Sequence, residues 1–103
     1  MEVVMDKYLL SRNADDLSFK FKGELNTLIC MEIEAEILKE VENHKKKVIF
    51  DLADVDYIAS SFIRLCGSVA SIVGNQNFAI SNVSKDIKKL MKKVGLYGVL
   101  NID

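Results

Sequence analysis

A change of hydrophobic period, repeated along the chain, restricts the fold more than any other feature of this sequence. Residues 17–21 alternate apolar and polar side chains, a period of two that is typical of a strand with one exposed face. The segment after Asn26 repeats apolar residues every four positions, which predicts a helix with one buried face. Asn26 or Thr27 is expected to cap this helix, and Gly23 to end the strand before it. The buried stripe is formed by Ile29, Ile33, Ile37 and Val41.

The same change of period occurs twice more. Residues 48–53 form a nearly continuous apolar run, typical of a central strand covered on both faces, and residues 54–59 are expected to form a loop. A second helix is predicted from Ser60 to about Val73. Residues 78–80 form another short apolar strand, and a third helix follows within 84–95, with a serine as its cap and a glycine after its end.

Two runs precede the first helix. Residues 3–10 and 17–21 are separated by a polar loop at 11–16 and are expected to pair as a hairpin, while a last strand is expected at 99–102. The element order is then β-β-α-β-α-β-α-β, which predicts an α/β fold with a mixed β-sheet and helices packed on it. A length of 103 residues fits a single domain spanning 1–103.

Charge and composition argue against several classes of function. The net charge is −1, from 14 basic and 15 acidic residues, so no concentrated basic surface for nucleic acid is expected. The sequence shows no transmembrane segment and no signal peptide, so no membrane insertion and a cytoplasmic location are expected. Cys30 and Cys66 are expected to be buried free thiols. Neither has a second Cys or His at ligand spacing, so no metal or cofactor is expected.

Two adjacent serines, Ser60 and Ser61, stand at the expected start of the second helix. A helix N-terminus exposes backbone N–H groups and a partial positive charge, so it holds anions well. Serine is also a favoured N-cap residue, and simple capping is the competing interpretation. A catalytic serine would need a base, but the only histidine, His44, lies at an expected helix end beside lysines, so no enzyme activity is expected. The acidic residues of 51–56 are expected to be solvated or to cap, and not to hold a cation.

The sequence around these serines resembles a known family. Residues 48–63, VIFDLADVDYIASSFI, are similar to the signature of STAS domains. There an apolar strand runs into Asp-Leu, then a Val and an aromatic-Ile pair, then Asp-Ser-Ser-Gly-Leu at a helix start. Residues 21–26, FKGELN, are similar to the family's earlier Gly-Glu-Leu-Asp, and residues 82–102 to its closing helix and strand. The resemblance runs from about Val4 to Ile102 and implies a STAS-like fold.

The resemblance implies the function of an anti-sigma factor antagonist, or anti-anti-sigma factor. In that type, the second serine of the pair is phosphorylated by a partner kinase that is also an anti-sigma factor, and a phosphatase restores binding. Ser61 matches this phosphoacceptor and Ser60 the first serine. A phosphate adds about −1.5 to −2 charges, which would oppose burial of this face under an apolar partner surface.

Three positions depart from the family pattern. Asn26 and Ala59 stand where Asp is usual, and Phe62 stands where Gly is usual. Together with Ser60, they are the expected binding residues around Ser61, and the Phe62 ring is expected either to narrow kinase access or to form an apolar docking contact. Phe62 and Ala59 favour an alternative, a STAS accessory or scaffold subunit of a transport or signalling complex that is never phosphorylated. A third hypothesis is a small-ligand binder. Apolar surface left open near the C-terminus is expected to serve a partner or a homodimer.

Overall fold

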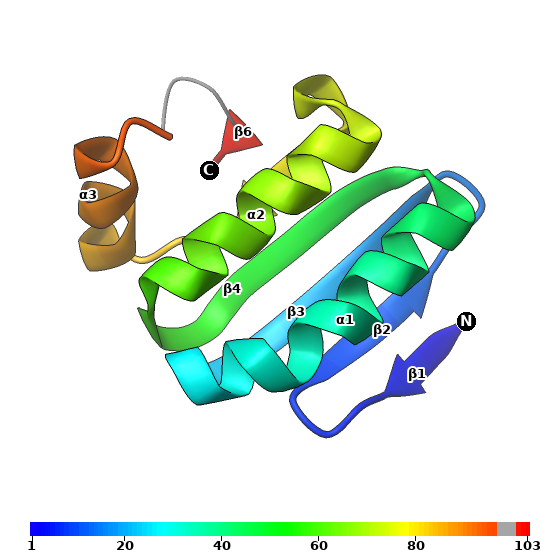
Figure 1. The fold of residues 1–103 in the computed structure, drawn as a ribbon, viewed down its shortest axis with the longest axis horizontal. Coiled ribbons are helices and arrows are strands. Elements are labelled where there is room, and N and C mark those ends of the chain that lie inside the picture. The colour runs from blue at the N-terminus through cyan, green and yellow to red at the C-terminus, as the bar shows by residue number, and fades with distance from the viewer. Residues whose placement is uncertain (97–100) are drawn as a thin grey trace.

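Strands and helices alternate along the chain (Figure 1). The computed structural model describes residues 1–96 and 101–103. Within them, six strands form one sheet in the order β1-β2-β3-β4-β5-β6. The strands are β1 (Glu2–Val4), β2 (Tyr8–Arg12), β3 (Asp16–Leu25), β4 (Lys47–Ile58), β5 (Phe78–Ser81) and β6 (Asn101–Ile102). The helices are α1 (Thr27–His44), α2 (Ser60–Val73) and α3 (Lys85–Lys93), with a short 3-10 helix, η1 (Asn75–Asn77), before β5.

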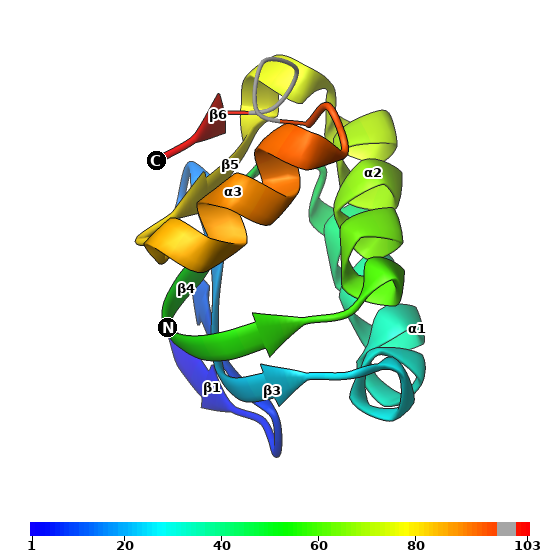
Figure 2. The same cartoon turned by 90° about the vertical axis from the view of Figure 1, so that its left-hand side faces the viewer.

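The sheet is mixed. Strands β1, β2 and β3 are antiparallel neighbours, whereas β3, β4, β5 and β6 are parallel neighbours. Helices α1 and α2 lie side by side on one face of the sheet, and α3 lies beyond α2, on the side of β5 (Figures 1 and 2). This arrangement confirms the α/β fold with a mixed sheet, helices packed on it and an antiparallel opening segment. The expectation that residues 48–53 are covered on both faces is wrong, because the helices cover one face and burial alternates along β4 (Figure 2).

The core fills the space between the sheet and α1 and α2. It contains all five phenylalanines of the chain, each fully buried: Phe19, Phe21, Phe50, Phe62 and Phe78. Phe50 of the central strand β4 meets Phe21 and Phe78 edge to face, with ring centroids 5.0 Å apart in both pairs. Such pairs add about 0.5–1.5 kcal/mol beyond the area that the rings bury. The predicted stripe of α1 is also buried at Ile33, Ile37 and Val41, while Ile29 is only partly buried.

Strand β4 continues where the sequence predicts a loop at 54–59. Its partner β3 also continues past Gly23 to Leu25, and the register between the two strands shifts after Lys20 and after Gly23. Gly23 has a φ of +75°, which a glycine adopts freely, so an irregularity of the bulge type lets the pairing continue. The expected loop and the expected end of β3 at Gly23 are therefore wrong, because the pairing of two long strands overrides the local signals.

The ends of the sheet refine the expected hairpin. The apolar run 3–10 divides into β1 and β2, because Met5 N donates to Tyr8 O at 2.9 Å and turns the chain. The loop at 11–16 is shorter than expected, since β2 extends to Arg12 and β3 begins at Asp16. The last expected strand, 99–102, lies partly outside the described residues, and its end forms β6 beside β5.

An ion pair joins β2 to α1. The guanidinium of Arg12 donates from Nε to Glu40 Oε2 at 2.7 Å and from Nη2 to Oε1 at 3.0 Å. His44 Nε2 lies 3.0 Å from the same Oε2. The hydrogen bond from Arg12 holds the pKa of the Glu40 carboxyl below its usual value, although partial burial opposes this. The bidentate pair therefore fixes α1 against the antiparallel part of the sheet.

Candidate functional site

Helices α1 and α2 begin at the same edge of the sheet. Strand β3 ends at Leu25 and β4 at Ile58, and these two residues are partners in the parallel register. Ala59 N donates to Leu25 O at 2.9 Å, which holds the two strand ends together. Figure 2 shows both strands running into their helices at this edge. The structure therefore brings the site residues expected at Asn26 and at 59–62 into one region.

The two helix starts are capped differently. Asn26 is the N-cap of α1, and its Oδ1 accepts from Ile29 N at 2.9 Å, as the sequence predicts. The N-cap of α2 is Ala59, whose side chain cannot accept a hydrogen bond. Neither serine occupies the N-cap position, so the capping interpretation of the serine pair is wrong. The first turn of α2 carries no acidic residue, so the partial positive charge of this helix end is not neutralised by its own helix.

The two serines point to different environments. Ser60 is exposed. The Oγ of Ser61 is buried, and no hydrogen-bond partner for it exists among the described residues. It lies beside the thiol of Cys30 on α1. Burial raises the pKa of that thiol, and the Ser61 hydroxyl opposes this rise with a smaller effect. This contact falls short of hydrogen-bond geometry, and Cys30 Sγ instead contacts Leu25 O at 3.7 Å. The Ser61 hydroxyl thus faces the α1–α2 interface in this conformation.

The other expected binding residues also differ in exposure. Phe62 is 0% exposed, and its ring lies 5.4 Å from that of Phe21 and 5.7 Å from that of Phe50. It is a core residue, so the expectation that its ring contacts a partner is wrong. The reason is its place in the helix: the third residue of α2 points down onto the sheet. Ala59 is nearly buried, with 6% exposed, whereas Tyr57, two residues before it, is 51% exposed.

Three large apolar side chains are exposed at this edge. Leu28 and Met31 lie three residues apart near the start of α1 and are 65% and 68% exposed. Tyr57 lies at the end of β4, opposite Glu24 of β3. We call Leu28, Met31, Tyr57 and Ser60 the α1–α2 edge. Sequence reasoning missed Leu28 and Met31, although both fall outside the buried stripe of their helix and could have been recognised from that.

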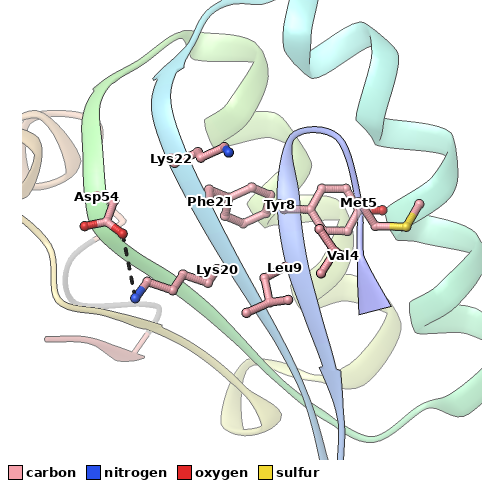
Figure 3. Close-up of a pocket in the computed structure, with 8 residues that line it drawn as sticks. All are labelled: Val4, Met5, Tyr8, Leu9, Lys20, Phe21, Lys22 and Asp54. Atoms are coloured by element: carbon pink, nitrogen blue, oxygen red, sulfur yellow. Dashed lines mark ion pairs between the residues drawn. The ribbon is translucent and has the colours of Figure 1, made fainter. Parts of the chain in front are cut away.

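The hollow at the β1–β2 turn is a weaker candidate than this edge. A hollow of about 140 Å³ lies near the β1–β2 turn, where Lys20 Nζ pairs with Asp54 Oδ2 at 3.7 Å (Figure 3). It is smaller than the roughly 300–1,000 Å³ of typical ligand pockets. Its lining residues are Val4, Met5, Tyr8, Leu9, Lys20, Phe21, Lys22 and Asp54.

The carboxylate of Asp51, one of the acidic residues considered for a cation, has a structural role. Asp51 Oδ1 accepts from Ala53 N at 2.9 Å and from Asn82 Nδ2 at 3.1 Å, so it ties the end of β5 to β4.

Within residues 1–96 and 101–103, no group of three or more His, Cys, Asp or Glu residues is arranged to hold a metal ion. None of the described helices is long and apolar enough to cross a membrane. Cys30 and Cys66 are free and buried, as expected.

Comparison with solved structures places the same fold in several anti-sigma factor antagonists. The unphosphorylated form of the anti-sigma factor antagonist SpoIIAA matches with a TM-score of 0.79 at 16% identity, over 93% of this chain and 87% of that one. An anti-sigma-factor antagonist (STAS) domain protein from Planctomyces limnophilus matches with a TM-score of 0.83 at 19% identity, over 97% and 91%. A putative anti-sigma factor antagonist from Thermotoga maritima gives 0.82 at 16%, over 92% and 84%.

These identities are low, so the structures show a shared fold only. No curated protein sequence matches the chain significantly. A family model for the STAS domain matches residues 8–103, which include every element from β2 to β6. The chain therefore belongs to the STAS domain family.

Proposed function

We propose that this chain is an anti-sigma factor antagonist that binds its partner through the α1–α2 edge. The observation that carries the proposal is the exposure of Leu28 and Met31 in the first turns of α1 and of Tyr57 near the end of β4. Large apolar side chains left exposed at one edge are typical of protein-binding sites. The matched solved structures, which are described as anti-sigma factor antagonists, support this class of partner. In this role the chain is a cytoplasmic regulator of transcription, without enzyme activity of its own.

The binding proposal is tested with a candidate anti-sigma factor kinase from the organism that encodes this chain. Leu28→Ser, Met31→Ser and Tyr57→Ser are each expected to weaken binding roughly tenfold or more, as measured by calorimetry. Val94→Ser is the control, because Val94 is 49% exposed but follows α3, which lies on the other side of α2 from α1 (Figure 1). Equal affinity for all four variants and the wild type would contradict the proposal.

We also propose that Ser61 is the phosphoacceptor and that its phosphorylation blocks docking. The start of α2 supports this, since Ala59 supplies no capping side chain and the helix dipole favours an anion. A phosphate at the buried position of Ser61 Oγ would be cut off from water. The side chain must therefore rotate outward before phosphoryl transfer. The phosphoryl group then lies on the α1–α2 edge. There its charge of about −1.5 to −2 would have to be desolvated under a partner.

Phosphorylation is tested separately from binding. The wild type, Ser61→Ala and Ser60→Ala are incubated with the kinase and ATP, and the site is read by mass spectrometry. Phosphate on the wild type and on Ser60→Ala, but not on Ser61→Ala, is the expected result. Afterwards, a phosphatase should restore partner binding.

A second candidate function follows from the buried hydroxyl itself. Because Ser61 Oγ faces Cys30 and not the solvent, the structure is also compatible with a STAS accessory or scaffold subunit that binds constitutively. Docking that persists with no phosphate on either serine, and with full affinity for Ser61→Asp, would favour this role over the switch.

A further inference from the structure

Charge is strongly segregated between α1 and α3. Helix α1 carries five glutamates and one lysine, a net charge of −4 with its histidine neutral. Helix α3 carries five lysines and one aspartate, a net charge of +4 over only nine residues. The net charge of the whole chain is −1, so this small value results from one acidic and one basic helix whose charges cancel.

The two charged helices lie apart in one molecule. Helix α2 lies between α1 and α3, and the two charged helices occupy opposite sides of it (Figures 1 and 2). The acidic surface of α1 and the basic surface of α3 are therefore separated by α2 within a single copy (Figures 1 and 2).

Several of these charges lie on the outer helix faces. Glu32 and Glu42 of α1 are exposed, and so are Lys85 and Lys89 of α3. Glu40 differs, because it is paired with Arg12. The exposed charges give α1 an excess of negative charge and α3 an excess of positive charge.

Apolar groups accompany both surfaces. Met31 and Leu28 project from α1 beside Glu32. On α3, an open groove of about 610 Å³ is lined by Leu90, three lysines and Asp86, and Val94 just beyond the helix is 49% exposed. The apolar side chains beside Glu32 on α1 thus have a counterpart on α3, where Leu90 lies among lysines that outnumber the one acidic residue.

We propose that the α3 face binds the α1 face of a second copy of this chain. The contact is heterologous, since the two copies use different surfaces, and each pair leaves one free α1 face and one free α3 face at its ends. Further copies can then add head to tail, as an open series or a closed ring. This contact would use Leu28 and Met31, which also belong to the proposed partner site, but it is tested on the purified chain alone and does not depend on the proposed function.

The experiment follows the average mass of the purified chain by sedimentation at low and high salt. At low salt the mass is expected to rise with protein concentration, and at high salt it is expected to fall to that of a single chain. Lys85→Glu/Lys89→Glu and Glu32→Lys/Glu42→Lys are each expected to lose association. Both pairs lie at exposed positions, so the fold is expected to persist, and circular dichroism checks this.

The charge swap is the decisive step. Mixing the two reversed variants in equal amounts is expected to restore association, because each then offers the complement of the other. Lys22→Glu/Lys47→Glu changes the net charge by the same amount as the α3 variant, but on exposed positions of β3 and β4, and is expected to associate like the wild type. A single-chain mass for the wild type at low salt, or no recovery in the mixture, would overturn the proposal.

Discussion

The Ser61 hydroxyl and the Cys30 thiol lie side by side between α1 and α2, and the contact leaves the hydroxyl without a hydrogen-bond partner among the described residues. A thiol is a weak donor and a weak acceptor, so it satisfies a hydroxyl poorly. A buried polar group left unsatisfied costs about 1–3 kcal/mol. The folded chain thus keeps its candidate phosphoacceptor in an unfavourable place, from which outward rotation of the side chain regains hydrogen bonds to solvent.

Removing this hydroxyl is expected to stabilise the fold. Ser61→Ala deletes the unsatisfied group and should raise the free energy of unfolding by about 1 kcal/mol, as measured by urea denaturation. Ser60→Ala is the matched control, because Ser60 is exposed, and it should change stability by less than about 0.5 kcal/mol. A clear loss of stability in Ser61→Ala would show that the hydroxyl makes a favourable hydrogen bond in solution.

Truncation of Phe62 is expected to be costly. The ring is fully buried between the rings of Phe21 and Phe50, so Phe62→Ala leaves a cavity in the core. The expected loss in the free energy of unfolding is about 3–5 kcal/mol by urea denaturation. Phe62→Leu keeps more of the volume and should lose less. Near-wild-type stability of Phe62→Ala would mean that the ring is exposed in solution and available to a partner.

The cap of α1 provides a smaller test. Asn26→Ala removes the acceptor for Ile29 N and should lower the free energy of unfolding by about 1 kcal/mol. Asn26→Asp introduces the residue that is usual at this position in the STAS pattern and keeps a side-chain oxygen. The stability of this variant should therefore stay close to that of the wild type. A loss of similar size in both variants would indicate that the amide group has a role besides capping.

The sequence predicted the parts of the fold that depend on local pattern. The stripe Ile33, Ile37 and Val41 and the caps Asn26 and Ser84 are read from residues close in the chain, and all are confirmed. The extension of β4 through residues 54–58 depends on β3, which lies more than 30 residues away, and local polarity at those positions favours a loop. Tertiary pairing decides such cases.

The candidate site was predicted in position but not in orientation. Sequence spacing places Ser60, Ser61 and Phe62 at a helix start, and the structure agrees. Which of them faces outward depends on how α2 is rotated against α1 and the sheet, and that rotation is set by packing. The same packing buries Phe62 and leaves Leu28 and Met31 exposed. From the sequence of α1, only its buried apolar stripe was predicted.

The ion pair between Arg12 and Glu40 is expected to make stability depend on pH in the acid range. The hydrogen bond from Arg12 lowers the folded-state pKa of Glu40 below its ordinary value of 4.5, so folding favours the charged carboxylate. The stabilisation is fully present above the unfolded-state pKa and is lost as the pH falls through the folded-state pKa. Glu40→Gln should therefore be less stable than the wild type near neutral pH. This difference should begin to shrink as the pH falls below about 4.5 and should be smallest below the folded-state pKa, where the wild-type carboxylate is protonated in both states.

The measurement is urea denaturation of both proteins across the acid range, with Arg12→Ala as the second variant. Because the hydrogen bond from Arg12 is the largest cause of the lowered pKa, Arg12→Ala should flatten the acid dependence in the same way as Glu40→Gln. The double variant should lose little more than either single one, since the two side chains share one interaction. A constant difference between the wild type and Glu40→Gln at all pH values would show that the carboxylate gains nothing from its charge in the folded state.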